Sequence, residues 1–398
     1  MRPKTKYTKS GDFNIAYQVI GNGPIDILYI PGWVSNIDMM WAEPRLAAFL
    51  TRLSLFARLI IFDKRGTGLS DRSDAYSTME ARMDDINAVL DATRSEKAFL
   101  FSHSEGGSVS LLYTLKFPQR ALGVIGFGIF AKRRYSEDYP WAPTDEERAV
   151  SNKLIEDNWA HGSLDELRIL VPSLAHDTGF MDWFASYLRS GASPGAALIL
   201  HKQCARIDVT GVLDSIKTPT LLLFREGDVE IRVEEGRYLA ERIPNSKLVE
   251  FTGKDHLFWT GDTYAVLAEI EEFVTGIRPN KSEFKGAKSI TNKTAIALET
   301  VMSENFLYNL KVEEFAKLCG RSLSAFKRDF QKTFNMTPSR WLKNKRLEHA
   351  KTLLIESDLN ISQICYDCGF INSSHFIKSF KEKYSIPPQK YRSDTISA

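Results

Sequence analysis

The chain has 398 residues, which is long enough for two or three domains with sizeable hydrophobic cores. With 43% hydrophobic and 26% charged residues, its composition is that of an ordinary soluble globular protein. No apolar stretch reaches the roughly 18 residues of a membrane helix, and the basic amino-terminal segment lacks the apolar core of a secretory signal. Four cysteines make no disulfide framework in a chain of this size. We therefore expect a cytoplasmic protein without a membrane partner.

The net charge of +2 hides a difference between the two parts of the chain. Residues 281–398 contain 20 Lys and Arg against 12 Asp and Glu, a net charge of +8, whereas residues 1–280 carry −6. A basic domain behind an acidic body is typical of a chain in which only the second part meets a polyanion. The alternative is a basic surface that is merely solvated.

The first 275 residues alternate short apolar runs with amphipathic stretches. This rhythm predicts buried parallel strands covered by helices on both faces of an α/β sheet. Residues 132–204 interrupt it with aromatic, helical segments, which we interpret as an inserted cap. The runs that predict strands are "IDILYI", "ARLIIF", "AFLF", "LGVIGFGIF", "TLLLF" and "KLVEF".

The stretch "FSHSEGG" follows the third of these runs and opens a helical pattern. It places Ser104 at a strand-to-helix corner, where a serine hydroxyl is exposed above the edge of the sheet. A serine nucleophile needs an imidazole to accept its proton and an acid to orient that imidazole. Asp228, after "TLLLFREG", and His256, in a loop after "KLVEF", follow in that chain order. The backbone N–H of Glu105 would meet the oxyanion.

Together with "YIPGW", "IFDKRGTGLSDR" and "GKDH", this stretch resembles the α/β-hydrolase fold over about residues 6–278. The most similar form is the hydrolase-like domain that is fused to adenylate cyclases and to LuxR-type or AraC-type regulators. The resemblance implies a Ser104–His256–Asp228 triad and a second oxyanion donor at the backbone of Trp33.

Each of these residues also has a plainer interpretation. Ser104 could be a helix cap, His256 an ordinary loop histidine, and Asp255 competes with Asp228 although we expect it to point away. Two positions depart from the usual G-x-S-x-G pattern. Ser102 replaces the first glycine, where we expect a positive φ to cost about 1 kcal/mol. Glu105 puts a carboxylate beside the oxyanion site, which opposes catalysis unless a cation pairs with it.

Residues 279–293 are polar with a flexible composition, and we predict a linker there, between a hydrolase-like domain over 1–278 and an all-α domain over 294–398. The all-α domain contains an internal repeat. "LKVEEFAKLCGRSLSAFKRDFQKTFNMTP" is matched by "LNISQICYDCGFINSSHFIKSFKEKYSIPP", each unit being a helix, a glycine turn and a helix with aromatics at every fourth position. This pattern predicts two helix-turn-helix units.

The second helix of such a unit enters the major groove of DNA. The two candidates begin near Ser322 and Ser373, and a helix over residues 339–355, roughly 25 Å long, would hold them about one DNA turn apart. Their outward positions, predicted to contact DNA, are Ser324, Lys327, Arg328, Lys332, Ser373, Ser374, His375, Ile377, Lys378 and Lys381.

Motifs such as "SAFKRDF", "RLEHAKTLL", "ICYDCGF" and "PPQKYR" make residues 295–392 similar to the DNA-binding domain of AraC/XylS-type transcription regulators. The resemblance implies engagement of two major grooves of double-stranded DNA, often as half of a homodimer. Cys365 and Cys368 form a C-x-x-C pair, but they lie where this family has small core residues. We expect no metal and no cofactor.

Three functions fit these observations. The first, which we favour, is a sequence-specific transcription regulator whose hydrolase-like domain binds, and hydrolyses slowly, a small-molecule effector. The second is an ester or amide hydrolase that uses the basic domain as a DNA tether. The third is a catalytically dead fold that serves only as sensor and dimerisation scaffold. The cap has no readable specificity motif, so the effector is not predicted.

Overall fold

The computed structural model divides the chain into two compact units, Arg2–Asn280 and Lys281–Ala398, each described here by itself. The residues described are 3–72, 77–159, 165–279, 298, 301–302, 306, 312–319, 321–357, 359–370 and 372–396. The predicted linker therefore lies outside the described residues apart from Pro279, and the predicted domain and cap boundaries stay predictions.

The first unit is built on one eight-stranded sheet with the order β1-β2-β4-β3-β5-β6-β7-β8. The β1–β2 and β2–β4 pairs are antiparallel and all other pairs are parallel. The six apolar runs correspond to β3–β8. Strands β1 and β2 were not predicted; they form a hairpin that turns at Gly11, which has a φ of +58°. The strands are β1 Lys6–Ser10, β2 Phe13–Ile20, β3 Asp26–Ile30, β4 Arg58–Phe62, β5 Ala98–His103, β6 Ala121–Phe127, β7 Thr220–Arg225 and β8 Ser246–Phe251.

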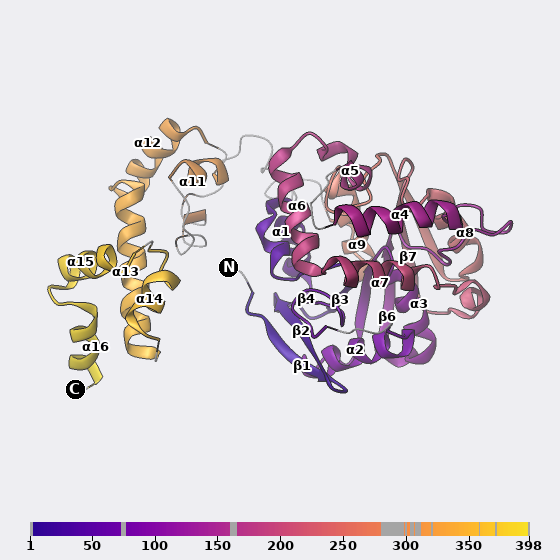
Figure 1. Cartoon of the computed structure of the whole chain (residues 1–398), viewed down its shortest axis with the longest axis horizontal. Coiled ribbons are helices and arrows are strands. Elements are labelled where there is room, and N and C mark those ends of the chain that lie inside the picture. Colours follow the sequence, from indigo (N-terminus) through magenta and orange to yellow (C-terminus); the bar gives the residue numbers. More distant parts are fainter. Residues whose placement is uncertain are drawn as a thin grey trace. The chain divides into compact units, whose positions relative to one another are not determined.

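Helices cover both faces of this sheet (Figure 1), which confirms the predicted α/β class. Alternate strand residues face the two layers: Leu28 packs in a cluster with α2 and α3, while the neighbouring Tyr29 packs against Phe258 on the opposite side. Between β6 and β7 the chain forms α4–α7, and α4 packs against α7. The helices are α1 Pro44–Phe56, α2 Met79–Ala92, α3 Gly106–Lys116, α4 Asp145–Asn158, α5 Asp165–Leu170, α6 Thr178–Gly191, α7 Pro194–Cys204, α8 Val233–Arg242 and α9 Thr263–Thr275.

The second unit is helical throughout its described residues, and it contains two hydrophobic clusters, one for each repeat. Phe326 and Phe330 of α12 are fully buried in the first cluster, and Phe376 and Phe380 of α15 are fully buried in the second. The aromatic residues at every fourth position therefore face inward, as the repeat predicts. The helices are α11 Val312–Leu318, α12 Leu323–Phe334, α13 Pro338–Glu356, α14 Ile361–Asp367, α15 Ser373–Tyr384 and α16 Pro388–Ile396.

The longest of these helices, α13, joins the two helix-turn-helix units. It begins at Pro338, capped by the Thr337 side chain, and its 19 residues make it about 28 Å long, close to the length predicted. The turn before α15 contains Gly369 with a φ of +74°, as predicted, whereas Gly320 of the first turn lies outside the described residues.

Candidate active site and nucleic-acid interface

Ser104 occupies a sharp corner between β5 and α3. Its φ of +52° lies in the left-handed region, which costs a residue with a Cβ about 1–2 kcal/mol. Two close approaches hold the corner: Ser104 N donates to Phe127 O at 3.1 Å, and an added Cβ on Gly106 would lie 2.5 Å from Ile30 O. Strain of this kind at a polar residue is typical of a functional site.

The prediction that Ser102 carries the positive φ is wrong. Ser102 is an ordinary residue of β5, paired with Ile30 on one side and Gly126 on the other. Its hydroxyl is buried and lies 2.5 Å from Ser110 Oγ. Position 102, the first of the G-x-S-x-G pattern, therefore needs a small side chain for packing. The backbone strain lies at Ser104, the central serine of that pattern.

His256 and Asp228 form a buried pair beside this corner. The Nδ1 atom of His256 lies 2.8 Å from Oδ2 of Asp228, and a carboxylate acceptor requires the proton to be on Nδ1. Oδ1 of Asp228 accepts the backbone N–H groups of Glu230 and Ile231, so the carboxylate is held on both sides. This arrangement leaves Nε2 of neutral His256 as the free proton acceptor.

Burial and charge act in opposite directions on His256. Burial lowers its pKa, but the Asp228 carboxylate outweighs burial and raises the pKa above the usual range. Two further polar residues near this pair, Asp255 and His103, make other contacts. Asp255 accepts from the backbone and hydroxyl of Ser173, so it points away as expected, and His103 donates Nε2–H to the His256 carbonyl at 3.0 Å. Burial and the neighbouring His256 lower the pKa of His103 to about 3, which keeps it neutral.

Ser104 and His256 line the same small cavity of about 110 Å³. Within the described part of the chain, no hydrogen bond joins Ser104 Oγ to the imidazole. In unliganded hydrolases this contact is often long and shortens only with substrate bound, so the geometry is compatible with a nucleophile and its base. The Ser104–His256–Asp228 triad therefore stays a prediction.

The two predicted oxyanion donors lie around Ser104. Trp33 and Glu105 line a larger cavity of about 270 Å³ together with Ser104, and Ser104 belongs to both cavities. Among the described residues, neither backbone N–H has a hydrogen-bond acceptor. Gly32 lets the segment after β3, which contains Trp33, lie close to the corner. A Cβ added to Gly32 would lie only 3.2 Å from Ser104 Cβ. Two uncommitted N–H donors beside a serine are what an oxyanion site requires.

The Glu105 carboxylate is paired with two cations that the sequence did not reveal. Its side chain is 1% exposed and lies 2.5 Å from Arg82 Nη2 of α2 and 3.2 Å from Lys64 Nζ, which follows β4. Burial raises the pKa of Glu105, but the two cations outweigh burial and hold it below its usual value. Two positive charges therefore cancel the carboxylate that would otherwise oppose an oxyanion.

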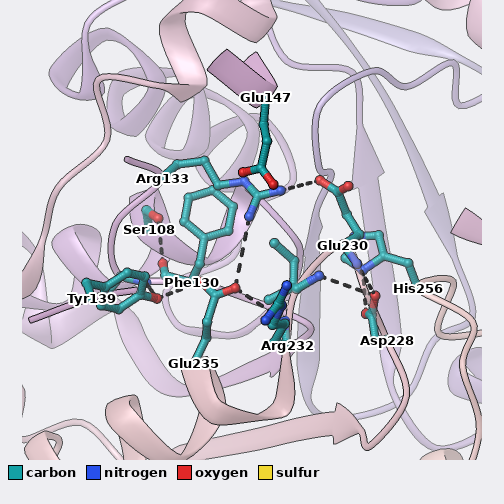
Figure 2. A network of polar contacts seen from close by, with 12 residues as sticks. Ser108, Phe130, Arg133, Tyr139, Glu147, Asp228, Glu230, Arg232, Glu235 and His256 are labelled. Atoms are coloured by element: carbon teal, nitrogen blue, oxygen red, sulfur yellow. Dashed lines mark hydrogen bonds and ion pairs between the residues drawn. The ribbon is translucent and has the colours of Figure 1, made fainter. Parts of the chain in front are cut away.

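A second polar network reaches the larger cavity from β6 and β7 (Figure 2). Arg133 makes an ion pair with Glu230, which lines both cavities, and its Nη1 lies 4.0 Å from Oε1 of buried Glu235. Tyr139 donates its hydroxyl to Glu235 at 2.7 Å. Burial raises the pKa of Glu235 to about 7, although Arg133 and Tyr139 act in the opposite direction. The network thus holds the charged Glu230 carboxylate near His256.

The predicted DNA-contacting residues lie on α12 and α15. Ser322 caps α12 by accepting from Ala325 N, and Asn372 caps α15 by accepting from His375 N. Nine of the ten predicted residues are exposed and Ser373 is half-buried. Ile377 is 38% exposed, and an exposed apolar side chain on this helix fits a contact with a thymine methyl group. The exposed residues are Ser324, Lys327, Arg328, Lys332, Ser374, His375, Ile377, Lys378 and Lys381.

Cys365 and Cys368 are free, fully buried thiols in the second hydrophobic cluster of this unit. Sγ of Cys365 lies 3.9 Å from Phe370 O, so these side chains behave as small core residues. Across the residues that the structure describes, no group of His, Cys, Asp and Glu is arranged to hold a metal ion, and no helix is long and apolar enough to cross a membrane.

Comparison with known proteins divides the chain in the same way. Residues 27–262 match the family model of the alpha/beta hydrolase fold, and residues 315–394 match that of a helix-turn-helix domain. The first match extends over more than half of the chain and covers nearly all of β3 to β8, the corner at Ser104 and the His256 loop.

Individual relatives match one unit each. The HTH-type transcriptional regulator ExsA of Pseudomonas aeruginosa is 27% identical over 105 residues, which are 26% of this chain and 38% of ExsA. The chain thus spans about two fifths of the length of the first regulators it matches. RutD of Caulobacter sp. strain K31 is 23% identical over 284 residues, 67% of this chain and 98% of RutD. An esterase from Exiguobacterium antarcticum, 20% identical, superposes with a TM-score of 0.61 over 68% of this chain and 99% of its own.

Proposed function

Because this chain belongs to the α/β-hydrolase fold family and carries an AraC-type helix-turn-helix domain, we propose that it is a transcription regulator whose first unit binds and hydrolyses a small-molecule effector. The observation that carries the proposal is Ser104. A serine with a φ of +52° lies between two cavities, with two free N–H donors and a buried His256–Asp228 pair around it. A purely structural corner would need none of these neighbours.

The proposed reaction is acyl transfer through Ser104. Ser104 Oγ attacks the carbonyl carbon of a bound ester, lactone or amide, and its proton passes to His256 Nε2. The carbonyl oxygen becomes an oxyanion that accepts the N–H groups of Trp33 and Glu105. As the carbon–oxygen or carbon–nitrogen bond of the leaving group breaks, that group takes the proton from His256. Water then attacks the acyl-serine with His256 as the base, which releases the acid and restores Ser104.

Asp228 has a positioning role in this scheme. It holds the imidazole with Nδ1 protonated and stabilises the imidazolium that forms during the attack. Lys64 and Arg82 keep the Glu105 carboxylate from opposing the oxyanion, so an acidic residue next to the nucleophile is compatible with turnover.

The second unit supports binding of double-stranded DNA through α12 and α15. Exposed Lys and Arg on these helices suit phosphate oxygens and guanine edges, and Ser and Ile suit other base edges. We infer that effector binding changes the affinity for DNA, which requires the effector to favour one state of the chain over another. Assembly into a homodimer on paired sites is part of the same proposal.

The test uses the full chain and DNA fragments that it selects from a random double-stranded pool. Wild type should enrich specific sequences, and charge reversal at Lys327, Arg328 and Lys378 together should abolish the selected binding in fluorescence anisotropy. Lys153→Glu, an exposed change in the hydrolase unit, is the control and should bind as wild type does. Undiminished binding by the triple variant would refute the regulator proposal.

A further inference from the structure

Arg148 of α4 is a buried guanidinium without a carboxylate partner. The residue is 8% exposed and lines the larger cavity together with Ser104. Its Nη2 donates to the backbone carbonyl of Arg133, and its Nε is buried with no hydrogen-bond partner. In the described part of the chain, no Asp or Glu lies within ion-pair distance of it. A buried charge of this kind is unfavourable unless a partner is supplied from outside.

The other buried charges of the cavity are already matched. Glu105 is paired with Lys64 and Arg82, and the Glu230 carboxylate is taken up by Arg133. A ligand anion that approached Arg133 would be repelled by Glu230, which lines the same cavity. Arg148 meets no such carboxylate. Among the described residues, the cavity has one further cation without an ion pair, Arg189, but that side chain is exposed and donates to Ser186 Oγ. Arg148 is therefore the buried cation of the cavity that is open to an anionic ligand.

The remaining lining of the cavity is largely apolar and neutral. Trp33, Phe130, Ile155 and Trp159 contribute apolar surface. His201 donates Nδ1–H to Asn152 at 2.8 Å, and burial, with the nearby Arg148, lowers its pKa to about 4, so it adds no second positive charge at neutral pH. A matching ligand has an apolar body and one anionic group, with its carbonyl at the Ser104 end.

We propose that the effector is a carboxylate-bearing ester, lactone or amide whose carboxylate binds the Arg148 guanidinium while its scissile carbonyl lies at Ser104. The inference rests on the proposed function for the end of the ligand that reacts at Ser104. For the anionic end of the ligand it rests on Arg148 alone. A guanidinium binds a carboxylate through paired N–H donors, and Arg148 has donors left over for this.

The experiment compares two p-nitrophenyl esters that differ only at the far end of a six-carbon acyl chain. One ends in a carboxylate (p-nitrophenyl hydrogen adipate) and the other in a carboxamide. For wild type we expect a KM for the carboxylate ester about 10- to 100-fold lower, the range of one charge-assisted hydrogen-bonded pair. In Arg148→Met the two KM values should become equal, and Arg148→Lys should keep part of the preference.

Arg134→Met is the matched control, because Arg134 is an exposed neighbour of Arg133 that pairs with Asp145 and lines neither cavity. It should keep the full preference. The melting temperature of each variant checks that Arg148→Met is folded; if it is not, Arg148→Lys and the calorimetric comparison below decide. Equal KM values in wild type, or a preference that survives in Arg148→Met, would overturn the proposal.

Calorimetric titration separates this proposal from the proposed hydrolysis. Adipamic acid, with one carboxylate, and adipamide, with none, are titrated into wild type, Arg148→Met and Arg148→Lys. If adipamic acid binds wild type more tightly than adipamide does, and this difference is lost in Arg148→Met, the anion site is supported even if neither ester is hydrolysed. Absence of hydrolysis would then count only against the catalytic role of Ser104. Equal binding of the two compounds to wild type overturns the anion site whatever the turnover.

Discussion

Cations are used in opposite ways in the two units. In the hydrolase unit Lys64, Arg82 and Arg133 are buried, and each is paired with a carboxylate. In the helical unit Lys327 and Lys378 are exposed, and among the described residues neither has an ion-pair partner. Buried pairs shape the field around a reacting atom, whereas exposed unpaired cations attract a polyanion. In the proposed function, the same residue types therefore serve a small molecule in one unit and DNA in the other.

The largest effect should come from Ser104→Ala. If Ser104 is the nucleophile, kcat/KM for activated esters should fall by at least about 1000-fold, because no other group forms the acyl intermediate. DNA affinity without effector should not change, since α12 and α15 are untouched. Stopped-time assays of p-nitrophenol release measure kcat/KM, and fluorescence anisotropy measures the affinity for DNA. Equal rates in wild type and variant would mean that the hydrolase unit does not turn over esters.

Glu105→Ala should mainly affect stability. It leaves Lys64 and Arg82 buried without their carboxylate, which should lower the free energy of unfolding by about 3 kcal/mol or more. Six of the seven tryptophans lie in the hydrolase unit, so urea unfolding followed by tryptophan fluorescence reports on it.

The control for this change is Glu250→Ala, which removes the carboxylate partner of exposed Arg237; the Glu250 side chain is 26% exposed, against 1% for Glu105. It should cost less than about 1 kcal/mol. Similar losses in the two variants would show that the Lys64–Glu105–Arg82 cluster is no more important than a surface ion pair.

Two features of the hydrolase unit show what could be predicted from the sequence. Strands β3–β7 were predicted because they are largely buried and read as continuous apolar runs. Strand β8 is half-buried at an edge of the sheet, and it was predicted from the apolar residues of "KLVEF". The edge strand β1 was missed, because its half-exposed residues are polar and lysine-rich. Ser104, Asp228 and His256 were predicted to lie together because each follows a predicted strand, and parallel strands bring their carboxyl ends to one edge.

The charge environment of the site could not be predicted. Lys64 and Arg82 lie 41 and 23 residues before Glu105, and only the packing of α2 beside the corner brings them together. Arg148 reaches the cavity from a helix of the segment that we interpreted as a cap, where no motif marks it. In the helical unit the sequence was more informative, because the aromatic period alone separates the inner from the outer face of α12 and α15.

Single alanine substitutions should sharpen the description of the DNA interface. Lys327→Ala or Lys378→Ala removes one cation, and if that cation contacts a phosphate, the slope of log K against log salt should change by about 0.9. Titrations at several salt concentrations measure this slope. Lys153→Ala should leave it unchanged, and an unchanged slope in all variants would place the DNA on another surface.

The smallest effect concerns pH. The general base must be neutral, and the raised pKa of His256 means that kcat/KM should fall about tenfold per pH unit below that pKa. Glu230 also raises this pKa, so Glu230→Gln should move the midpoint to lower pH by less than about one unit. Glu226→Gln, an exposed change on the same loop, should not move it. A midpoint that moves to higher pH in Glu230→Gln would contradict the described electrostatics.

The most direct test of an activated serine in this chain is labelling of the full protein with a fluorophosphonate. The probe reacts with nucleophilic serines, and peptide mass spectrometry locates the adduct. We predict one adduct, on Ser104, that is lost in Ser104→Ala and His256→Ala and retained when Lys327 and Lys378 are replaced by alanine. An unlabelled wild type, or labelling that does not depend on His256, would contradict the account.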